Sequence, residues 1–238
     1  MLGSDHWIQC DVRIAKRRYG ADWADWVVSP GLLGPESIVY SFGLGQDVTF
    51  ETELIGAVNC RVYGFDPTPK SLQYLQSQKL PQKFSVLPYG LSTINGEKSF
   101  GDPVEGDSGF SFSTRSSVRH STKLAVRTLR SIMDELNHPT IDLLKIDIEG
   151  EEFDVIEQMI AAGIQPGQFL VEFHHVPKWR LGKLSDSRRS VDRLHKAGYL
   201  IFDISPGGRE FSFIHRSVLS RYDIQYREPP CPASTLNV

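Results

Sequence analysis

The sequence predicts a three-layer α/β fold, in which helices cover both faces of a mostly parallel β-sheet. The first observation is an ordered run over residues 37–69, where a strand, a glycine turn, a helix and a second strand with an acidic end follow one another. The second is a repeat of this order over residues 141–162. The third is the composition, since 238 residues that are 40% hydrophobic suffice for one domain with a substantial core.

The first unit predicts the floor of a nucleoside-binding site. The apolar run Ile38–Phe42 is typical of a strand buried on both faces, and it ends at Gly43 and Gly45, which can bend sharply and let a ligand approach the backbone N–H groups. The helix expected over 48–57 would point its first amides at that ligand. Asp66 ends the next strand, 21 residues after Gly45, where a carboxylate can accept both hydrogen bonds of a ribose diol.

Asp47 discriminates between two cofactors. It stands where the dinucleotide fingerprint has its third glycine, and its charge would repel a pyrophosphate at the helix end, although it could cap the helix itself. A cofactor with a cationic amino-acid tail tolerates a carboxylate there, so the sequence favours S-adenosylmethionine over NAD. An NAD-dependent oxidoreductase and a non-catalytic binding module with the same fold stay as alternatives.

The second unit predicts charged side chains at the same edge of the sheet. Alternation along the strand expected over 141–150 puts Lys145, Asp147 and Glu149 on one face. A buried Lys145 needs a carboxylate partner, and Asp147 is the nearest along the chain. Because ligands of open α/β sheets lie across the carboxyl ends of the strands, Asp147 and Glu149 should line the same cleft as Gly43.

A further strand, expected over 169–175, brings a histidine to this edge. Glu172 and His174 share one face at its tip. His174 is the first candidate for a general base, and Glu149 is the second. Asp147, Glu172 and His174 could instead gather a divalent metal, but no metal is expected, because Lys145 could equally neutralise the carboxylates.

The flanking segments complete the predicted organisation. Residues 1–36, rich in tryptophan, are expected to form a helical cap or lid, residues 37–226 the main domain, and residues 227–238 a disordered tail. The turn Pro206–Gly208 permits a hairpin, so the last strand should run antiparallel.

Composition limits the partners and the compartment. The net charge of −3 does not suggest nucleic acid as a default partner, and no stretch approaches the roughly 20 apolar residues that span a bilayer. The three cysteines lack metal-ligand spacing, which predicts reduced thiols in a cytoplasmic protein. The oligomeric state does not follow from the sequence.

Three stretches, LLKIDIEGEEFDVI, VYSFGLGQDVTFE and VYGFDPTPKS, resemble the FkbM-type family of S-adenosylmethionine-dependent methyltransferases, in the branch that includes methyltransferase-like proteins. The resemblance covers about residues 35–215 and implies the class I methyltransferase (Rossmann-like) fold, with a seven-stranded sheet whose last strand is antiparallel. It also implies that Gly43 and Gly45 lie in the cofactor loop, that Asp66 binds the ribose, and that Gly90 and Leu91 border the adenine.

One position departs from the family pattern. An acidic residue often stands two positions before the first glycine, and here that place in the cofactor site is held by Ser41. The group that holds the methionine amino group is therefore open, with Asp147 and Asp47 as candidates. The resemblance implies O-methylation of a hydroxyl on a sugar or another small-molecule or glycan acceptor.

Overall fold

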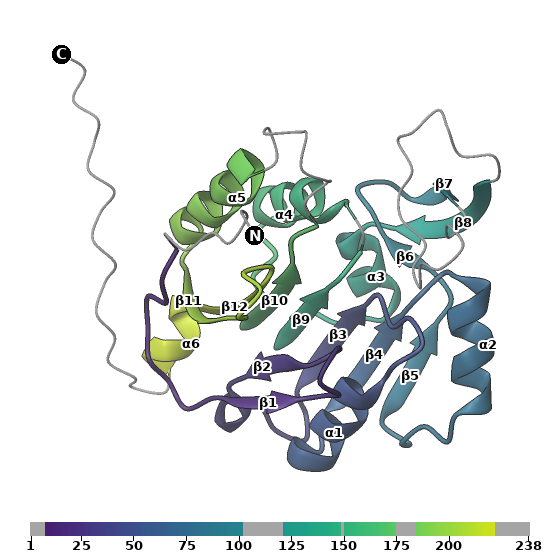
Figure 1. Cartoon of the computed structure of the whole chain (residues 1–238), viewed down its shortest axis with the longest axis horizontal. Coiled ribbons are helices and arrows are strands. Elements are labelled where there is room, and N and C mark those ends of the chain that lie inside the picture. Colours follow the sequence, from purple (N-terminus) through teal and green to yellow (C-terminus); the bar gives the residue numbers. More distant parts are fainter. Residues whose placement is uncertain (1–7, 102–120, 149, 175–183, 222–238) are drawn as a thin grey trace.

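A seven-stranded sheet forms the centre of the molecule, in the order β11-β12-β10-β9-β3-β4-β5 (Figure 1). The computed structural model describes residues 8–101, 121–148, 150–174 and 184–221. All neighbours are parallel except that β12 runs antiparallel to both β10 and β11, which confirms the predicted class I methyltransferase fold. The strands are β3 (Ile38–Phe42), β4 (Arg61–Phe65), β5 (Phe84–Leu87), β9 (Leu143–Ile146), β10 (Gln168–Glu172), β11 (Tyr199–Ile204) and β12 (Glu210–His215).

Two apolar core clusters, one on each face of the sheet, make the fold three-layered. Neighbouring residues of a strand alternate between them: Val39 belongs to one cluster and Tyr40 to the other, and Leu170 and Phe169 divide in the same way. Helices α3, α4 and α5 pack on the face of Tyr40, and α1, α2 and α6 contribute to the opposite cluster (Figure 1). The helices are α1 (Thr49–Val58), α2 (Pro69–Ser77), α3 (Leu129–Glu135), α4 (Glu152–Ala161), α5 (Leu184–Lys196) and α6 (Arg216–Arg221).

A small second sheet follows β5. Its order is β6-β8-β7, and its core consists of Phe100, Leu124 and Val126. The strands are β6 (Gly90–Leu91), β7 (Gly96–Gly101) and β8 (Ser121–Arg127). This sheet lies beside α3, away from the β11–β12 end of the main sheet (Figure 1).

The prediction of a helical cap over residues 1–36 is wrong for residues 8–36. They form the antiparallel pair β1 (Arg17–Tyr19) and β2 (Trp26–Val28), followed by a 3₁₀ helix over Pro30–Leu32. The physical reason is that β2 consists of an aromatic and two β-branched residues that are buried against the sheet. Residues 1–7 and the tail over 227–238 lie outside the described residues. None of the helices in the described ranges is both long and apolar enough to span a bilayer.

Candidate functional site

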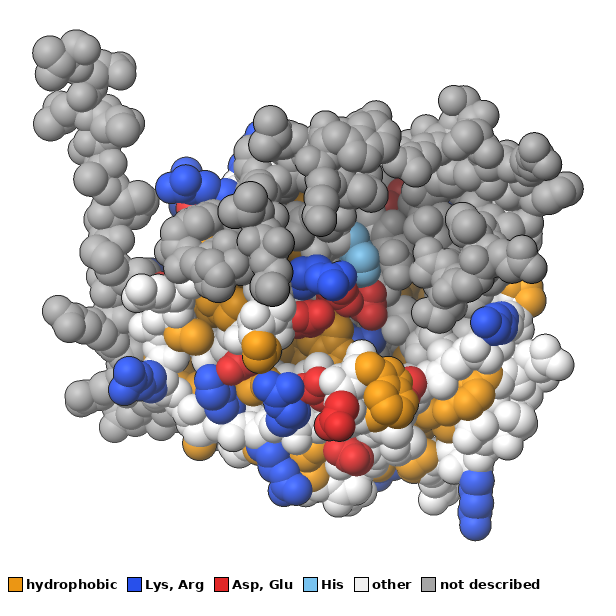
Figure 2. Space-filling view, viewed as in Figure 1, with side chains coloured by type: hydrophobic (Ala, Val, Ile, Leu, Met, Phe, Trp, Pro, Cys, Tyr) orange, Lys and Arg blue, Asp and Glu red, His pale blue; other side chains and the backbone are white. Residues whose placement is uncertain are grey.

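A cleft of about 620 Å³ lies at the carboxyl ends of β3, β9 and β10. Its lining includes the loop 43–47 after β3, the strand tips at Asp147 and Glu172, the turn between β11 and β12, and the β1–β2 hairpin. Figure 2 shows acidic side chains grouped in the middle of this face, beside a histidine. The volume is in the range of small-molecule sites, and the position is the one expected for a ligand of an open α/β sheet.

The glycine loop has the geometry that the sequence predicts. Gly43 and Gly45 have φ angles of +78° and +56°, which favour glycine. A Cβ on Gly43 would lie 1.8 Å from the carbonyl oxygen of Asp147, so the loop packs directly against the tip of β9. A Cβ on Gly45 would meet nothing within 4 Å, which leaves open space above its backbone.

Asp66 holds this loop in place. Its Oδ2 accepts the N–H of Gly45 at 2.9 Å, and its Oδ1 accepts the N–H of Thr68 at 2.8 Å and the hydroxyl at 2.7 Å. Asp66 is 4% exposed and is not among the described residues that line the cleft. Its contact with a ribose stays a prediction, and the observed bonds add a role in fixing the glycine loop.

The predicted adenine border lies further along the same edge. Gly90 and Leu91 are buried in β6, where a Cβ on Gly90 would approach Pro67 Cγ to 3.2 Å. Among the described residues that line the cleft, neither is present. The structure therefore places them beside the residue after Asp66 without bringing them to the acidic strand tips.

Asp47 lines the cleft and also binds the first residue of α1, Thr49. Its Oδ1 accepts the N–H of Thr49 at 2.8 Å and the Thr49 hydroxyl at 2.5 Å. The N-cap residue of α1 is Val48, so Asp47 does not cap the helix itself; it satisfies the N–H of Thr49 from one position before the cap, where the first amides have no partner within the helix.

A carboxylate that the sequence analysis missed lies beside Ser41. The Ser41 hydroxyl donates to Glu51 Oε1 at 2.5 Å, and both side chains are buried. Burial raises the pKa of Glu51, and the positive charge of Lys145 opposes that rise. Glu51 lies three and four positions before the buried residues Leu54 and Ile55, so helical periodicity could have identified it as a buried acid.

Lys145 faces the β3 loop. Its Nζ donates to the carbonyl oxygens of Phe42 at 3.4 Å and Gly43 at 3.1 Å, and it lies 5.2 Å from the centre of the Trp26 ring. Asp147 is the partner predicted for it, and burial raises the pKa of Asp147 while the charge of Lys145 opposes that rise, but the hydrogen bonds of Lys145 go to backbone oxygens. The carbonyl groups and the aromatic face together stabilise a buried ammonium group.

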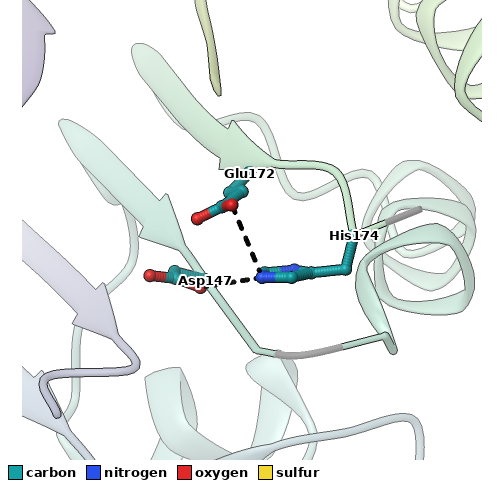
Figure 3. Close-up of side chains that lie close together, drawn as sticks. All are labelled: Asp147, Glu172 and His174. Carbon is teal, nitrogen blue, oxygen red and sulfur yellow. Dashed lines mark ion pairs between the residues drawn. The ribbon is translucent and has the colours of Figure 1, made fainter. Parts of the chain in front are cut away.

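Asp147, Glu172 and His174 come together at the tips of β9 and β10, as predicted (Figure 3). His174 Nε2 lies 3.6 Å from Asp147 Oδ1 and 3.6 Å from Glu172 Oε1. Burial and the negative charge of Asp147 raise the pKa of Glu172 to about 7. Burial also raises the pKa of Asp147, against the charges of Lys145 and His174.

Glu152 orients the histidine from behind. Its Oε1 lies 2.7 Å from His174 Nδ1 and accepts the N–H of Gly150 at 2.9 Å. Glu152 is fully buried at the start of α4, and the sequence analysis assigned it only to that helix. Glu149, the second candidate base, lies outside the described residues.

The strand order, the glycine loop at the tip of β3 and the acidic end of β4 define a class I methyltransferase domain. The family model described as "Methyltransferase FkbM domain" matches residues 37–201. The chain therefore belongs to the FkbM family of S-adenosylmethionine-dependent methyltransferases, which confirms the predicted family, enzyme class and cofactor.

The curated relatives differ in what their names state. The chain is 32% identical to "Probable methyltransferase-like protein 24" of Rattus norvegicus over 160 residues, and this match covers 65% of this chain and 37% of the relative. The Homo sapiens protein of the same name is 32% identical over 159 residues. "Hexuronic acid methyltransferase AglP" of Haloferax volcanii is 26% identical over 125 residues, half of each chain. The chain thus spans 37% of the length of the first two relatives.

Solved structures are similar at low identity. A putative rRNA methylase from Clostridium thermocellum has a TM-score of 0.45 at 9% identity and covers 78% of this chain and 89% of its own. Fibrillarin from Aeropyrum pernix with natively bound S-adenosyl-L-methionine has a TM-score of 0.42 at 11% identity, over 84% of this chain and 81% of its own. The fold class rests on the strand order and not on these scores.

Proposed function

We propose that this protein transfers the methyl group of S-adenosylmethionine to a hydroxyl group of a sugar, in a small-molecule or glycan acceptor. The observation that carries the proposal is the single cleft that joins the glycine loop to the acidic tips of β9 and β10. A methyl donor on the loop and an acceptor at the strand tips would share this space, so that the protein can align the two reacting groups and exclude water.

The residues present fit the methyl donor. The space above Gly45 leaves room for a ligand to approach the backbone, and the Asp66 carboxylate pins that backbone from the next strand. Glu51, which reaches Ser41 from α1, supplies a carboxylate for the methionine amino group in addition to Asp47 and Asp147. When bound, S-adenosylmethionine supplies a methyl group activated by a positively charged sulfur.

The acceptor side of the cleft supports a sugar. Trp23 lines the cleft with 82% of its surface exposed, and a large exposed aromatic side chain commonly marks a binding surface. Arg209, on the turn between β11 and β12, can meet an acidic group of an acceptor. The name of the distant relative from Haloferax volcanii states action on a hexuronic acid, which supports the same acceptor class.

His174 is the proposed base for the acceptor hydroxyl. Glu152 holds its Nδ1, so that Nε2 is directed toward the strand tips at Asp147 and Glu172. A histidine oriented by a buried carboxylate is a common arrangement for proton transfer. Glu149 stays the second candidate.

Transfer of radioactive methyl groups from S-adenosylmethionine to a panel of uronic acids, neutral glycosides and amines tests the proposal. We expect transfer to hydroxyl-bearing sugars. We also expect Trp23→Ala to raise KM for the sugar severalfold and to change the Kd of the methyl donor less, because the proposal assigns the exposed ring of Trp23, which lines the cleft, to the acceptor. Ile94→Ala, which changes an exposed hydrophobic residue outside the lining of the cleft, should leave both constants unchanged.

Two results would contradict the proposal. Transfer to amines alone would show a different acceptor class. Binding of the methyl donor without transfer to any member of a broad panel would favour the non-catalytic binding module. The family assignment already argues against the NAD-dependent oxidoreductase.

A further inference from the structure

We infer that Asp147, Glu172 and His174 form a binding site for one divalent cation of the Mn²⁺ or Mg²⁺ type. The three side chains each offer one ligand atom, and these atoms lie within 4.8 Å of one another (Figure 3). Two carboxylates with one imidazole make an oxygen-rich donor set, which suits these ions. The inference concerns the cation alone and does not depend on the identity of the acceptor.

The hydrogen bond at the back of His174 sets which ring nitrogen faces the cluster. Glu152 Oε1 accepts the N–H of Gly150, so it acts as an acceptor, and Nδ1 supplies the proton of the 2.7 Å contact. A neutral His174 then presents the lone pair of Nε2 to the two carboxylates. A histidine that donates one N–H to a carboxylate and directs the other nitrogen outward is typical of metal ligands.

The distances at the front of the ring suit an ion better than a direct hydrogen bond. Nε2 lies 3.6 Å from both carboxylate oxygens, which is longer than the roughly 2.7–2.9 Å of a charge-assisted hydrogen bond. Ligand atoms about 2.1 Å from one ion lie about 3 to 3.5 Å apart, close to the 3.6 Å from Nε2 to each carboxylate oxygen. Three electron-rich atoms converge here, and a cation among them removes their mutual repulsion.

Two cationic side chains of the described residues lie near the cluster, and neither is held between the three ligand atoms. Lys145 directs hydrogen bonds to the Phe42 and Gly43 carbonyls, so those N–H groups do not serve the cluster. Arg209 Nη1 lies 3.5 Å from Glu172 Oε1, but its side chain is 59% exposed and can turn away. Within the part of the chain that the structure describes, neither Lys145 nor Arg209 therefore occupies the position of the proposed ion.

The charge of the whole cleft points the same way. Eight of its lining residues are Asp or Glu, and three are Lys or Arg. Such an excess of negative charge concentrates cations in the cleft, and it would repel an anionic acceptor unless a cation offsets it. A divalent ion at the strand tips could also lower the pKa of an acceptor hydroxyl placed on it.

Titration of the full chain with Mn²⁺ tests the inference. Binding is measured by calorimetry and by the loss of the electron paramagnetic resonance signal of free Mn²⁺. We expect one Mn²⁺ per chain, at least about tenfold weaker binding in Asp147→Asn and in Glu172→Gln, and displacement by excess Mg²⁺. Asp22→Asn removes the same charge from the lining of the same cleft outside the cluster, and it should bind Mn²⁺ as the unchanged protein does.

Each other outcome overturns the inference. The unchanged protein could fail to bind Mn²⁺, or Glu172→Gln could bind as tightly as the unchanged protein. Equal weakening in Asp22→Asn would show a diffuse attraction to the acidic cleft and no specific site. If Asp147→Asn does not fold, as judged by circular dichroism, the isosteric Glu172→Gln decides. These readouts need no methyl transfer, so failure of the proposed function would not affect them.

Discussion

Among single residues, Gly43 connects the cofactor loop to the cluster of Asp147, Glu172 and His174, because its backbone packs against Asp147. Its φ angle of +78° is unfavourable for any residue with a Cβ, and the Cβ would in addition overlap the carbonyl oxygen of Asp147. The backbone of the loop and the tip of β9 can therefore touch only because this residue is glycine. The same contact sets the position of Asp147, a proposed metal ligand.

Gly43→Ala should separate the loop from β9. We expect a loss of several kcal/mol in the free energy of unfolding and no measurable binding of S-adenosylmethionine, because both the strained φ angle and the overlap with backbone must be relieved. Urea denaturation and calorimetry measure the two effects. Gly56→Ala, in α1 with nothing within 4 Å of the new Cβ, is the matched control and should gain about 0.5–1 kcal/mol. Equal behaviour of the two variants would contradict the role of Gly43.

Among the secondary-structure elements, the β1–β2 hairpin and the chain after it are attached to the main sheet by the amide side chain of Gln168. Gln168, at the start of β10, accepts the N–H of Ser29 at 2.8 Å and donates to its carbonyl oxygen at 3.0 Å, both in buried surroundings. Before the hairpin in the sequence, Asp11 and Val12 donate their N–H groups to the Ile201 carbonyl of β11. The segment that carries Trp23 and Trp26 lines the cleft, and these bonds attach it to β10, which presents Glu172, and to β11.

Gln168→Leu should loosen this attachment. It leaves the buried N–H of Ser29 without a partner and leaves the Ser29 carbonyl only the 3.3 Å hydrogen bond from the Leu32 N–H, which should cost about 2–3 kcal/mol of the free energy of unfolding. Gln158→Leu, which removes one half-buried hydrogen bond to Thr93, is the control and should cost about 1 kcal/mol or less. Urea denaturation of both variants measures the difference. A cost for Gln168→Leu no greater than the control would mean that the hairpin is held by its apolar contacts alone.

Buried titratable groups make the stability of the whole molecule depend on pH. Burial lowers the pKa of His215, whose ring nitrogens contact the Ser217 hydroxyl at 2.8 Å and the Ala197 carbonyl at 3.1 Å. The unfolded chain then takes up a proton before the folded one does, so stability from this group is present above about pH 6.5 and is lost as the pH falls. The raised pKa values of Asp147 and Glu172 act oppositely, and their contribution is lost as the pH rises.

His215→Gln should therefore flatten the acid side of the stability profile. We expect the melting temperature of the unchanged protein to fall more steeply than that of the variant between pH 7 and pH 5, since a glutamine has no proton to take up. Scanning calorimetry at intervals of pH measures both slopes. Parallel slopes would show that His215 titrates alike in the folded and unfolded states.

Much of the site could be predicted because its chemistry lies at the ends of locally recognisable strands. Gly43 and Gly45 end an apolar run, and Asp147, Glu172 and His174 follow two others, so the parallel arrangement alone brings them to one edge. Periodicity and glycine positions are properties of short stretches, and they survive without knowledge of the rest of the chain.

Only the tertiary structure decided which distant groups complete that site. The contact of Glu152 with His174, that of Glu51 with Ser41 and the bonds of Asp66 to the glycine loop depend on how elements pack across the chain. The β-structure of the N-terminal segment has the same origin, because residues 26–28 become a strand only where the sheet buries them. Local patterns of residues therefore predicted the family, the sheet and the reactive edge, and packing between distant elements determined the partners that orient each side chain.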